Sequence, residues 1–243
     1  MPNPVEGIDQ SNAPYVIVSS DTHAGLYVED YRPYLEASVH ADFDEWLVTR
    51  HQHRAMVEEL NGEYVERWEH DNEVGLKGAY DAAIRDKTLD ADGVAGEVIF
   101  ADGDAVTGME APPFGAGLQA GMITDSRLAW AGARAHNRWL EEFCATNPPR
   151  RAGVALVPIT HGIEESVREI ESLADKPGIR GIMIPTMWHD EPSYGHPCYD
   201  PIWAVCAEAG LVVHTHSGEA DTPAYNENMA WDHRSEQKIN QAA

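Results

Sequence analysis

Two short histidine motifs carry the residues whose types and spacing are best suited to chemistry. One, Asp-Thr-His, contains Asp21 and His23, and the other, His-Thr-His, contains His214 and His216. Each motif ends an apolar run, and side chains alternate along a strand, so the two outer residues of each motif should share a face. A carboxylate and imidazoles that converge at strand ends suit a divalent metal ion such as zinc.

A structural role is an equally open interpretation of these residues. Asp21 could act as a turn or cap residue and His23 as a hydrogen-bonded structural histidine, while His214 and His216 could be polar strand-end residues. A D-x-H pair recurs by chance. Its combination with H-x-H on another parallel strand strengthens the metal hypothesis.

The elements that would position these motifs are strands and helices that alternate regularly along the sequence. Apolar runs predict buried strands at 15–20, 94–101, 153–159, 179–185 and 211–216. Helical patterns occupy 126–146, 163–174 and 200–209. Alternating strands and helices predict a parallel sheet, and continuous apolar runs are typical of strands covered on both faces. A long charged stretch, about 43–85, predicts a helical insertion after the first strand.

The alternation fits either an open doubly wound sheet or part of a (β/α)₈ barrel. No G-x-G-x-x-G follows the first strand and no G-x-x-x-x-G-K-[ST] occurs, which disfavours the nucleotide-binding doubly wound folds. The ionisable residues instead cluster at the carboxyl ends of strands, where barrel active sites lie. The predicted fold class is therefore α/β, of the (β/α)₈ TIM-barrel type.

Composition excludes several classes of partner. The 243 residues include 41 Asp and Glu against 17 Lys and Arg, a formal net charge of −24. This balance argues against nucleic acid and against an anionic membrane surface, and it says nothing about a small-molecule substrate, because the charge of a pocket is independent of the net charge. No run approaches the ~20 apolar residues of a membrane span, and the first residues lack a signal-peptide pattern. Three cysteines without C-x-x-C spacing predict a reducing, cytoplasmic location.

Four stretches together resemble a known family. They read VIVSSDTHAG, AHNRWLEEFCATNPPRRAGVALVPI, GIRGIMIP and YDPIWAVCAEAGLVVHTHSGE, and they span most of residues 16–219. The family is the amidohydrolase-related family, in the branch that includes aminocarboxymuconate-semialdehyde decarboxylase. The resemblance implies a metal-dependent (β/α)₈ barrel and, because dimers are common there, a homodimer.

The resemblance also implies a ligand set. The family's first-strand pair falls on Asp21 and His23, and its fifth-strand histidine falls on His216. Members with two metals carry a carboxylated lysine at the end of strand four, where this chain has none and where Lys176 precedes the strand. One divalent metal ion, zinc or manganese, is therefore implied.

Other histidines rank lower as site residues. His214 lies one step deeper than His216 and is interpreted as substrate-facing or purely structural. His189 follows the fourth strand on the side of the site and could contact substrate or be an ordinary loop residue. His51 and His53 lie two apart in a predicted helix and do not share a face, so they are interpreted as surface residues.

One departure from the family concerns the carboxyl-terminal part of the barrel. The family requires an Asp after strand eight, whereas few residues follow Ser217 and they show no buried-strand pattern. We therefore expect residues 1–243 to form a single partial barrel, truncated after strand five, with its catalytic Asp outside the chain. Such a barrel exposes an unpaired edge, and poor activity of the isolated chain is expected.

The resemblance favours decarboxylation of a small carboxylated, aromatic or unsaturated substrate. Metal-dependent hydrolysis of an ester, lactone or amide is the alternative, because the same ligands can activate water. A third possibility is an inactive fragment that persists only through association.

Overall fold

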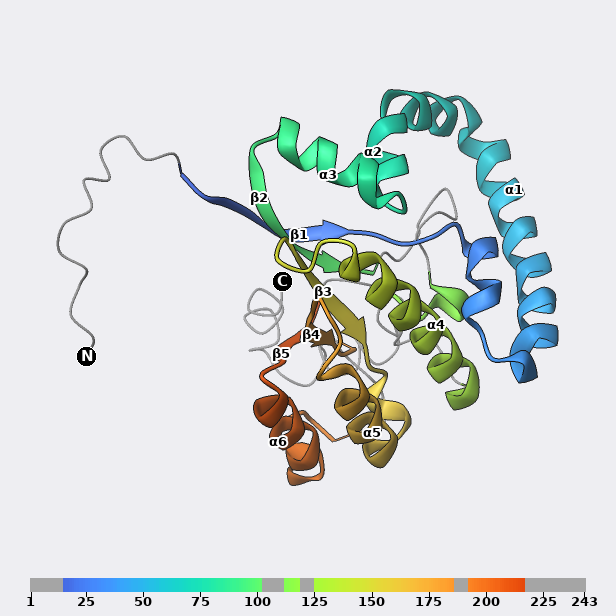
Figure 1. Ribbon diagram of the computed structural model, residues 1–243. Coiled ribbons are helices and arrows are strands. Elements are labelled where there is room, and N and C mark those ends of the chain that lie inside the picture. The colour runs from blue at the N-terminus through green and yellow to red at the C-terminus, as the bar shows by residue number, and fades with distance from the viewer. Residues whose placement is uncertain (1–14, 102–111, 119–124, 186–191, 217–243) are drawn as a thin grey trace, which may run out of the picture.

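The computed structural model describes residues 15–101, 112–118, 125–185 and 192–216, in which a parallel sheet curls into a half-barrel with helices around it (Figure 1). Its strands are β1 (Ile17–His23), β2 (Val94–Phe100), β3 (Arg151–Leu156), β4 (Ile179–Met183) and β5 (Val212–His214). They lie in the order β1-β2-β3-β4-β5, and all neighbours are parallel. An unbroken sequential order is that of a (β/α) barrel, because the order of a doubly wound sheet reverses at a switch point. The predicted fold class is confirmed.

Three helices connect the later strands: α4 (Ser126–Ala145), α5 (Ile163–Leu173) and α6 (Asp200–Ala209). The α4 helix begins where the Asp125 carboxylate accepts hydrogen bonds from the first free backbone N–H groups. The α6 helix ends at Gly210, whose φ of 67° is the left-handed cap conformation that glycine adopts without strain. These helices lie close to their predicted ranges.

A helical segment separates β1 from β2. It contains the 3₁₀ turns η2 (Val28–Tyr34) and η3 (Ala37–Val39), followed by α1 (His40–Asp71), α2 (Glu73–Gly78) and α3 (Ala82–Ala91). The helices extend beyond the predicted range of 43–85, because Asp81 caps α3 and no helix breaker follows before Gly93. The segment also supplies buried residues, among them Tyr31 and Phe43, so it is not merely a solvated insertion.

The core has two parts, one on each face of the sheet. A large cluster beneath the helices contains Ile99, Ala155 and Ile182, whereas a smaller one contains their chain neighbours Phe100, Val154, Leu156 and Met183. Adjacent strand residues belong to different clusters because their side chains alternate between the faces. The central strands are thus covered on both faces, as their apolar runs predict.

The prediction of burial is wrong for the two edge strands. Val18 of β1 is 57% exposed and Val212 of β5 is 56% exposed, and Tyr15 and Val16 before β1 are also exposed. Each edge strand has a neighbour on one side only among the described residues. An apolar run reports a strand's composition, whereas burial depends on what packs against the strand.

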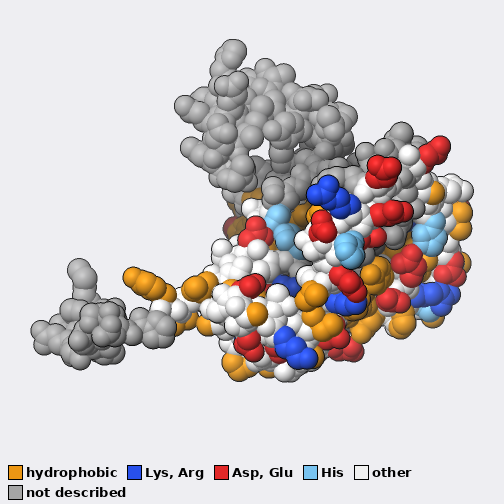
Figure 2. Space-filling view, turned by 90° about the horizontal axis from the view of Figure 1, so that it is seen from above, with side chains coloured by type: hydrophobic (Ala, Val, Ile, Leu, Met, Phe, Trp, Pro, Cys, Tyr) orange, Lys and Arg blue, Asp and Glu red, His pale blue; other side chains and the backbone are white. Residues whose placement is uncertain are grey.

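No helix in the described ranges is long and apolar enough to cross a membrane. On the face drawn in Figure 2, lysine and arginine side chains are scattered among acidic ones. Charged side chains of the described residues pair across elements, as Arg127 of α4 does with Asp42 of α1 at 2.8 Å. Such exposed pairs each contribute little to stability.

A buried histidine links α4 to the segment that leaves β1. His136 is fully buried, and its Nδ1 lies 2.9 Å from the hydroxyl of Tyr31, which accepts a hydrogen bond from the backbone N–H of Leu26. The Tyr31 hydroxyl and Nδ1 of His136 thus share a buried hydrogen bond. Burial lowers the pKa of His136 to about 3.

This histidine gives a pH-dependent contribution to stability. The unfolded chain protonates His136 below about pH 6.5, whereas the folded protein keeps it neutral, so its contribution is complete above that pH and is lost as the pH falls towards 3. Between pH 7 and pH 5 the free energy of unfolding should fall by about 2 kcal/mol from this group. Urea unfolding of the wild type and His136→Gln at both pH values tests this. An equal loss in both proteins would contradict it.

Candidate metal centre

Asp21, His23 and His216 converge at the carboxyl end of the sheet. One potential ligand atom from each residue lies within 4.8 Å of the other two. The Asp21 Oδ1 is 3.1 Å from Nε2 of His216 and 3.4 Å from Nε2 of His23. The side chain of Asp21 is 64% exposed, whereas those of His23 and His216 are 27% and 15% exposed. The two histidines of the cluster are therefore half-buried, whereas the aspartate is exposed.

The hydrogen bond of His23 determines which of its two ring nitrogens carries the proton and which has a lone pair. Its Nδ1 lies 3.2 Å from the carbonyl oxygen of Ala101, and a carbonyl can only accept, so Nδ1 carries the proton. In the neutral imidazole Nε2 is then unprotonated and points at the Asp21 carboxylate. The Nε2 of His23 and the Asp21 carboxylate oxygen lie 3.4 Å apart, an arrangement that suits a cation bound between them. An N–H bonded to a backbone carbonyl is the usual arrangement of metal-ligating histidines.

An irregularity in β1 directs Asp21 and His23 toward the cluster. Ser19 is paired with Glu97 and Thr22 with Ile99, so β1 contains one more residue than β2 over this interval. Such a bulge bends the strand and redirects its side chains. Thr22 faces the helices, where its hydroxyl lies 3.1 Å from a carboxylate oxygen of Glu97, while Asp21 and His23 face the cluster.

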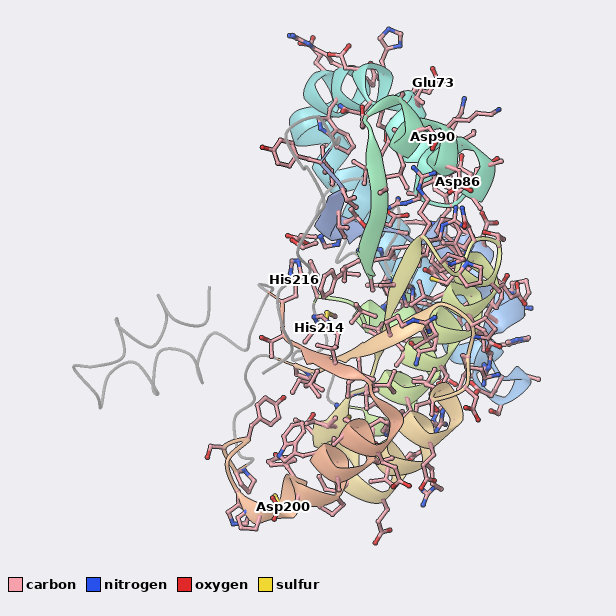
Figure 3. The ribbon with its side chains drawn as sticks, turned by 60° about the vertical axis from the view of Figure 1, so that its left-hand side comes forward. Glu73, Asp86, Asp90, Asp200, His214 and His216 are labelled. Carbon is pink, nitrogen blue, oxygen red and sulfur yellow. The ribbon has the colours of Figure 1, made fainter. Side chains whose placement is uncertain are left out.

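His214 shares the face of His216, as the alternation predicts, but it does not belong to the cluster. The aromatic ring of Phe100 lies 5.4 Å from the imidazole of His214 and 5.1 Å from that of His216, measured between ring centres. Figure 3 shows the two histidines following one another at the end of β5. Burial lowers the pKa of His214, so its neutral form is favoured.

Phe100 is the residue of this region that sequence reasoning missed. It ends β2 and lies beside three imidazoles, the third being His23 at 6.3 Å between ring centres. Its position at the end of the second strand, level with the ends of β1 and β5, is the signal that could have identified it.

Glycine at position 181 makes room for His214. A Cβ on Gly181 would come within 2.7 Å of the His214 ring and of the backbone oxygen of Val212. Gly181→Ala should therefore displace β5 and cost about 1–3 kcal/mol of unfolding free energy, as overpacking does. Chemical denaturation measures this cost, and Gly195→Ala is the control, since no atom lies within 4 Å of its added carbon. Equal stabilities of the two variants would contradict the crowding argument.

Of the remaining candidates, those that the structure describes lie away from the cluster. His189 falls outside the described residues. His51 is exposed and pairs with Glu29 at 2.6 Å on the helical segment, as a surface histidine would, and the side chain of His53 is not described. Lys176 precedes β4 and pairs with Glu141 at 2.9 Å, so it does not approach the cluster.

Comparison with known proteins identifies the family. A sequence model of the amidohydrolase family matches residues 51–237, which is most of the chain. The chain therefore belongs to the amidohydrolase family. No curated protein sequence gives a significant match.

Solved structures support the fold. The 5-carboxyvanillate decarboxylase of Novosphingobium aromaticivorans, complexed with manganese and a nitrobenzoic acid, superposes with a TM-score of 0.55 at 18% identity over 92% of this chain and 55% of its own. The 2,6-dihydroxybenzoate decarboxylase from Rhizobium gives 0.53 at 17% identity over 90% and 55%. The chain thus spans about half the length of these structures.

Proposed function

We propose that Asp21, His23 and His216 bind one divalent metal ion, manganese or zinc, in an enzyme that decarboxylates a small aromatic acid. The convergence of these three side chains is the single observation that carries the proposal. The donor set fits such an ion, because one carboxylate and two imidazoles suit both zinc and manganese. Membership of the amidohydrolase family supports it further.

The substrate class follows from the similar structures. One is a decarboxylase complexed with 2,6-dihydroxybenzoate, and another acts on 5-carboxyvanillate and contains manganese. Each is about as similar to this chain as the other, so a hydroxylated benzoic acid is the common substrate class. In the reaction the carboxylate would leave as CO₂, and a proton would take its place on the ring carbon.

The residues of this chain would have distinct tasks in that reaction. The metal ion, when bound, would supply a Lewis acid and an orienting template for substrate oxygens. His214 lies beside His216 and would contact the substrate, with the neutral form favoured by its burial. Phe100 would hold the two imidazoles apart and exclude water from the inner side of the site. His189 remains a second candidate for substrate contact.

Hydrolysis of an ester, lactone or amide is the competing outcome of the same ligand set. The 243-residue chain, loaded with manganese or zinc, should be incubated with 2,6-dihydroxybenzoate and 5-carboxyvanillate, and both CO₂ and the phenolic product should be measured. Because poor activity of this chain is expected, turnover should be slow, with CO₂ and phenol in equal amounts, lost in His216→Ala and kept in His51→Ala. Cleavage of test esters, lactones or amides without CO₂ would indicate hydrolysis, and complete inactivity would indicate the third possibility, an inactive fragment. Fast turnover would contradict the expected poor activity.

The location of the protein and its oligomeric state belong to the same proposal. A cytoplasmic location is supported by the three cysteines, all of which are free. A homodimer follows from the family resemblance alone, and sedimentation of the purified chain tests it. A monomer at micromolar concentration would contradict the dimer.

A further inference from the structure

A buried ion pair lies directly beneath the bulge of β1. The Glu97 side chain on β2 is fully buried, and the Arg85 side chain on α3 is 11% exposed. The Arg85 Nε lies 2.9 Å from both carboxylate oxygens, and its Nη2 donates to Oε2 at 2.7 Å. This is a forked, charge-assisted contact, the strongest kind that two side chains make.

Both members of the pair also hold β1. The Nη1 of Arg85 donates to the backbone carbonyl of His23 at 3.0 Å. The Thr22 hydroxyl, which has a single proton to donate, lies between two acceptors, a carboxylate oxygen of Glu97 at 3.1 Å and the carbonyl oxygen of Val98 at 2.8 Å. The ion pair thus contacts Thr22, which lies between the two proposed ligands, and the backbone of His23.

The surroundings balance the buried charges. Arg151 on β3 lies 3.8 Å from Glu97, and it pairs with Asp86 of α3 at 2.7 Å (Asp86 is labelled in Figure 3). Two arginines therefore face two carboxylates. Burying ion pairs is no better for stability than apolar packing of the same volume, whereas removing one partner is costly. Stability alone gives no reason for a charged network at this position.

We propose that Arg85 and Glu97 are positioning residues of the metal centre, because their buried ion pair fixes Thr22 and the His23 carbonyl and thereby the direction of Asp21 and His23. The inference rests on the proposed metal site. It also gives the helical segment between β1 and β2 a role in the site, since α3 carries Arg85.

A purely structural role makes a different prediction, namely that losing the pair lowers stability and leaves the metal centre unchanged. Arg134 of α4 provides the matched comparison, because it pairs with Glu169 of α5 at 3.1 Å in a half-buried network that does not touch β1. The Glu169 carboxylate also accepts a hydrogen bond from Asn137. Glu97→Gln and Glu169→Gln therefore remove the same charge from similar networks at different places.

The experiment titrates Mn²⁺ into the wild type, Glu97→Gln and Glu169→Gln, following the ion by electron paramagnetic resonance, with urea unfolding in parallel. We expect Glu97→Gln to weaken binding about 10–100-fold and to change the spectrum of the bound ion, as loss of outer-shell support does. Glu169→Gln should bind as the wild type does. Folded Glu97→Gln with wild-type affinity and spectrum would overturn the inference.

Two further outcomes keep the inference separate from the proposed function. If Glu97→Gln does not fold, Thr22→Val decides, because it keeps the side-chain shape and removes the hydroxyl that links β1 to Glu97 and to the Val98 carbonyl. Weaker binding by Thr22→Val supports the inference, and unchanged binding overturns it. A wild-type chain that binds no Mn²⁺ and no Zn²⁺ would overturn the metal site itself, and with it the positioning role.

Discussion

Replacing His216 with alanine should weaken binding of Mn²⁺ or Zn²⁺ by at least about 100-fold, since loss of a ligand costs more than loss of its outer-shell support. His216 is the proposed ligand that follows β5, and its Nε2 lies 3.1 Å from the Asp21 oxygen. Its removal leaves a carboxylate and one imidazole, which β1 alone supplies. Competition with a chelating dye measures the affinity of each variant.

His51→Ala is the matched control for that variant. It removes an imidazole that also contacts a carboxylate, at 2.6 Å, but on the exposed surface of the helical segment. Its metal affinity should equal that of the wild type. Equal losses of affinity in the two variants would indicate that ions bind to exposed histidine–carboxylate pairs in general, and would contradict a site at the strand ends.

Replacing Arg151 with methionine should destabilise the protein by about 3–5 kcal/mol, the cost of removing one partner of a buried ion pair. The Arg151 side chain is fully buried and donates to Asp86 and to the backbone carbonyls of Ala82 and Phe143. Methionine retains much of the packing volume but leaves these acceptors without their donor. Urea unfolding at pH 7 measures the change.

Arg180→Met is the control for this prediction. Arg180 is exposed on β4, and it donates a hydrogen bond to its neighbour, the carbonyl of Ile179. Surface substitutions of this kind usually change stability by less than ~0.5 kcal/mol. A loss below about 1 kcal/mol for Arg151→Met would contradict the view that the network is a buried and interdependent unit.

The sequence allowed the order of elements and the convergence of the site to be predicted. Strand-to-helix alternation is a local signal, and parallel strands bring their carboxyl ends to one edge, so pairing Asp21 and His23 with the motif of His214 and His216 followed from periodicity and topology. The resemblance added the identity of the expected ligand set. The structure brings these residues together, and their role in metal binding stays a prediction.

Other features depend on contacts that a single sequence does not encode locally. The exposure of Val18 and Val212 reflects that, among the described residues, each edge strand has a neighbouring strand on one side only, which an apolar run cannot report. The Arg85–Glu97 pair joins the helical segment to a strand that is otherwise apolar. A charged residue in an apolar run, such as Glu97 in VAGEVIF, is the one local sign that a buried partner must exist.

Anomalous diffraction from crystals of the 243-residue chain grown with MnCl₂ tests directly whether Asp21, His23 and His216 bind a metal ion. We expect one strong peak in the anomalous difference map at the manganese edge, within coordination distance of Asp21 Oδ1 and of the Nε2 atoms of His23 and His216. Crystals grown with zinc should give a peak at the same place. The absence of a peak there with either metal, or a peak bound only by residues outside this cluster, would contradict the account.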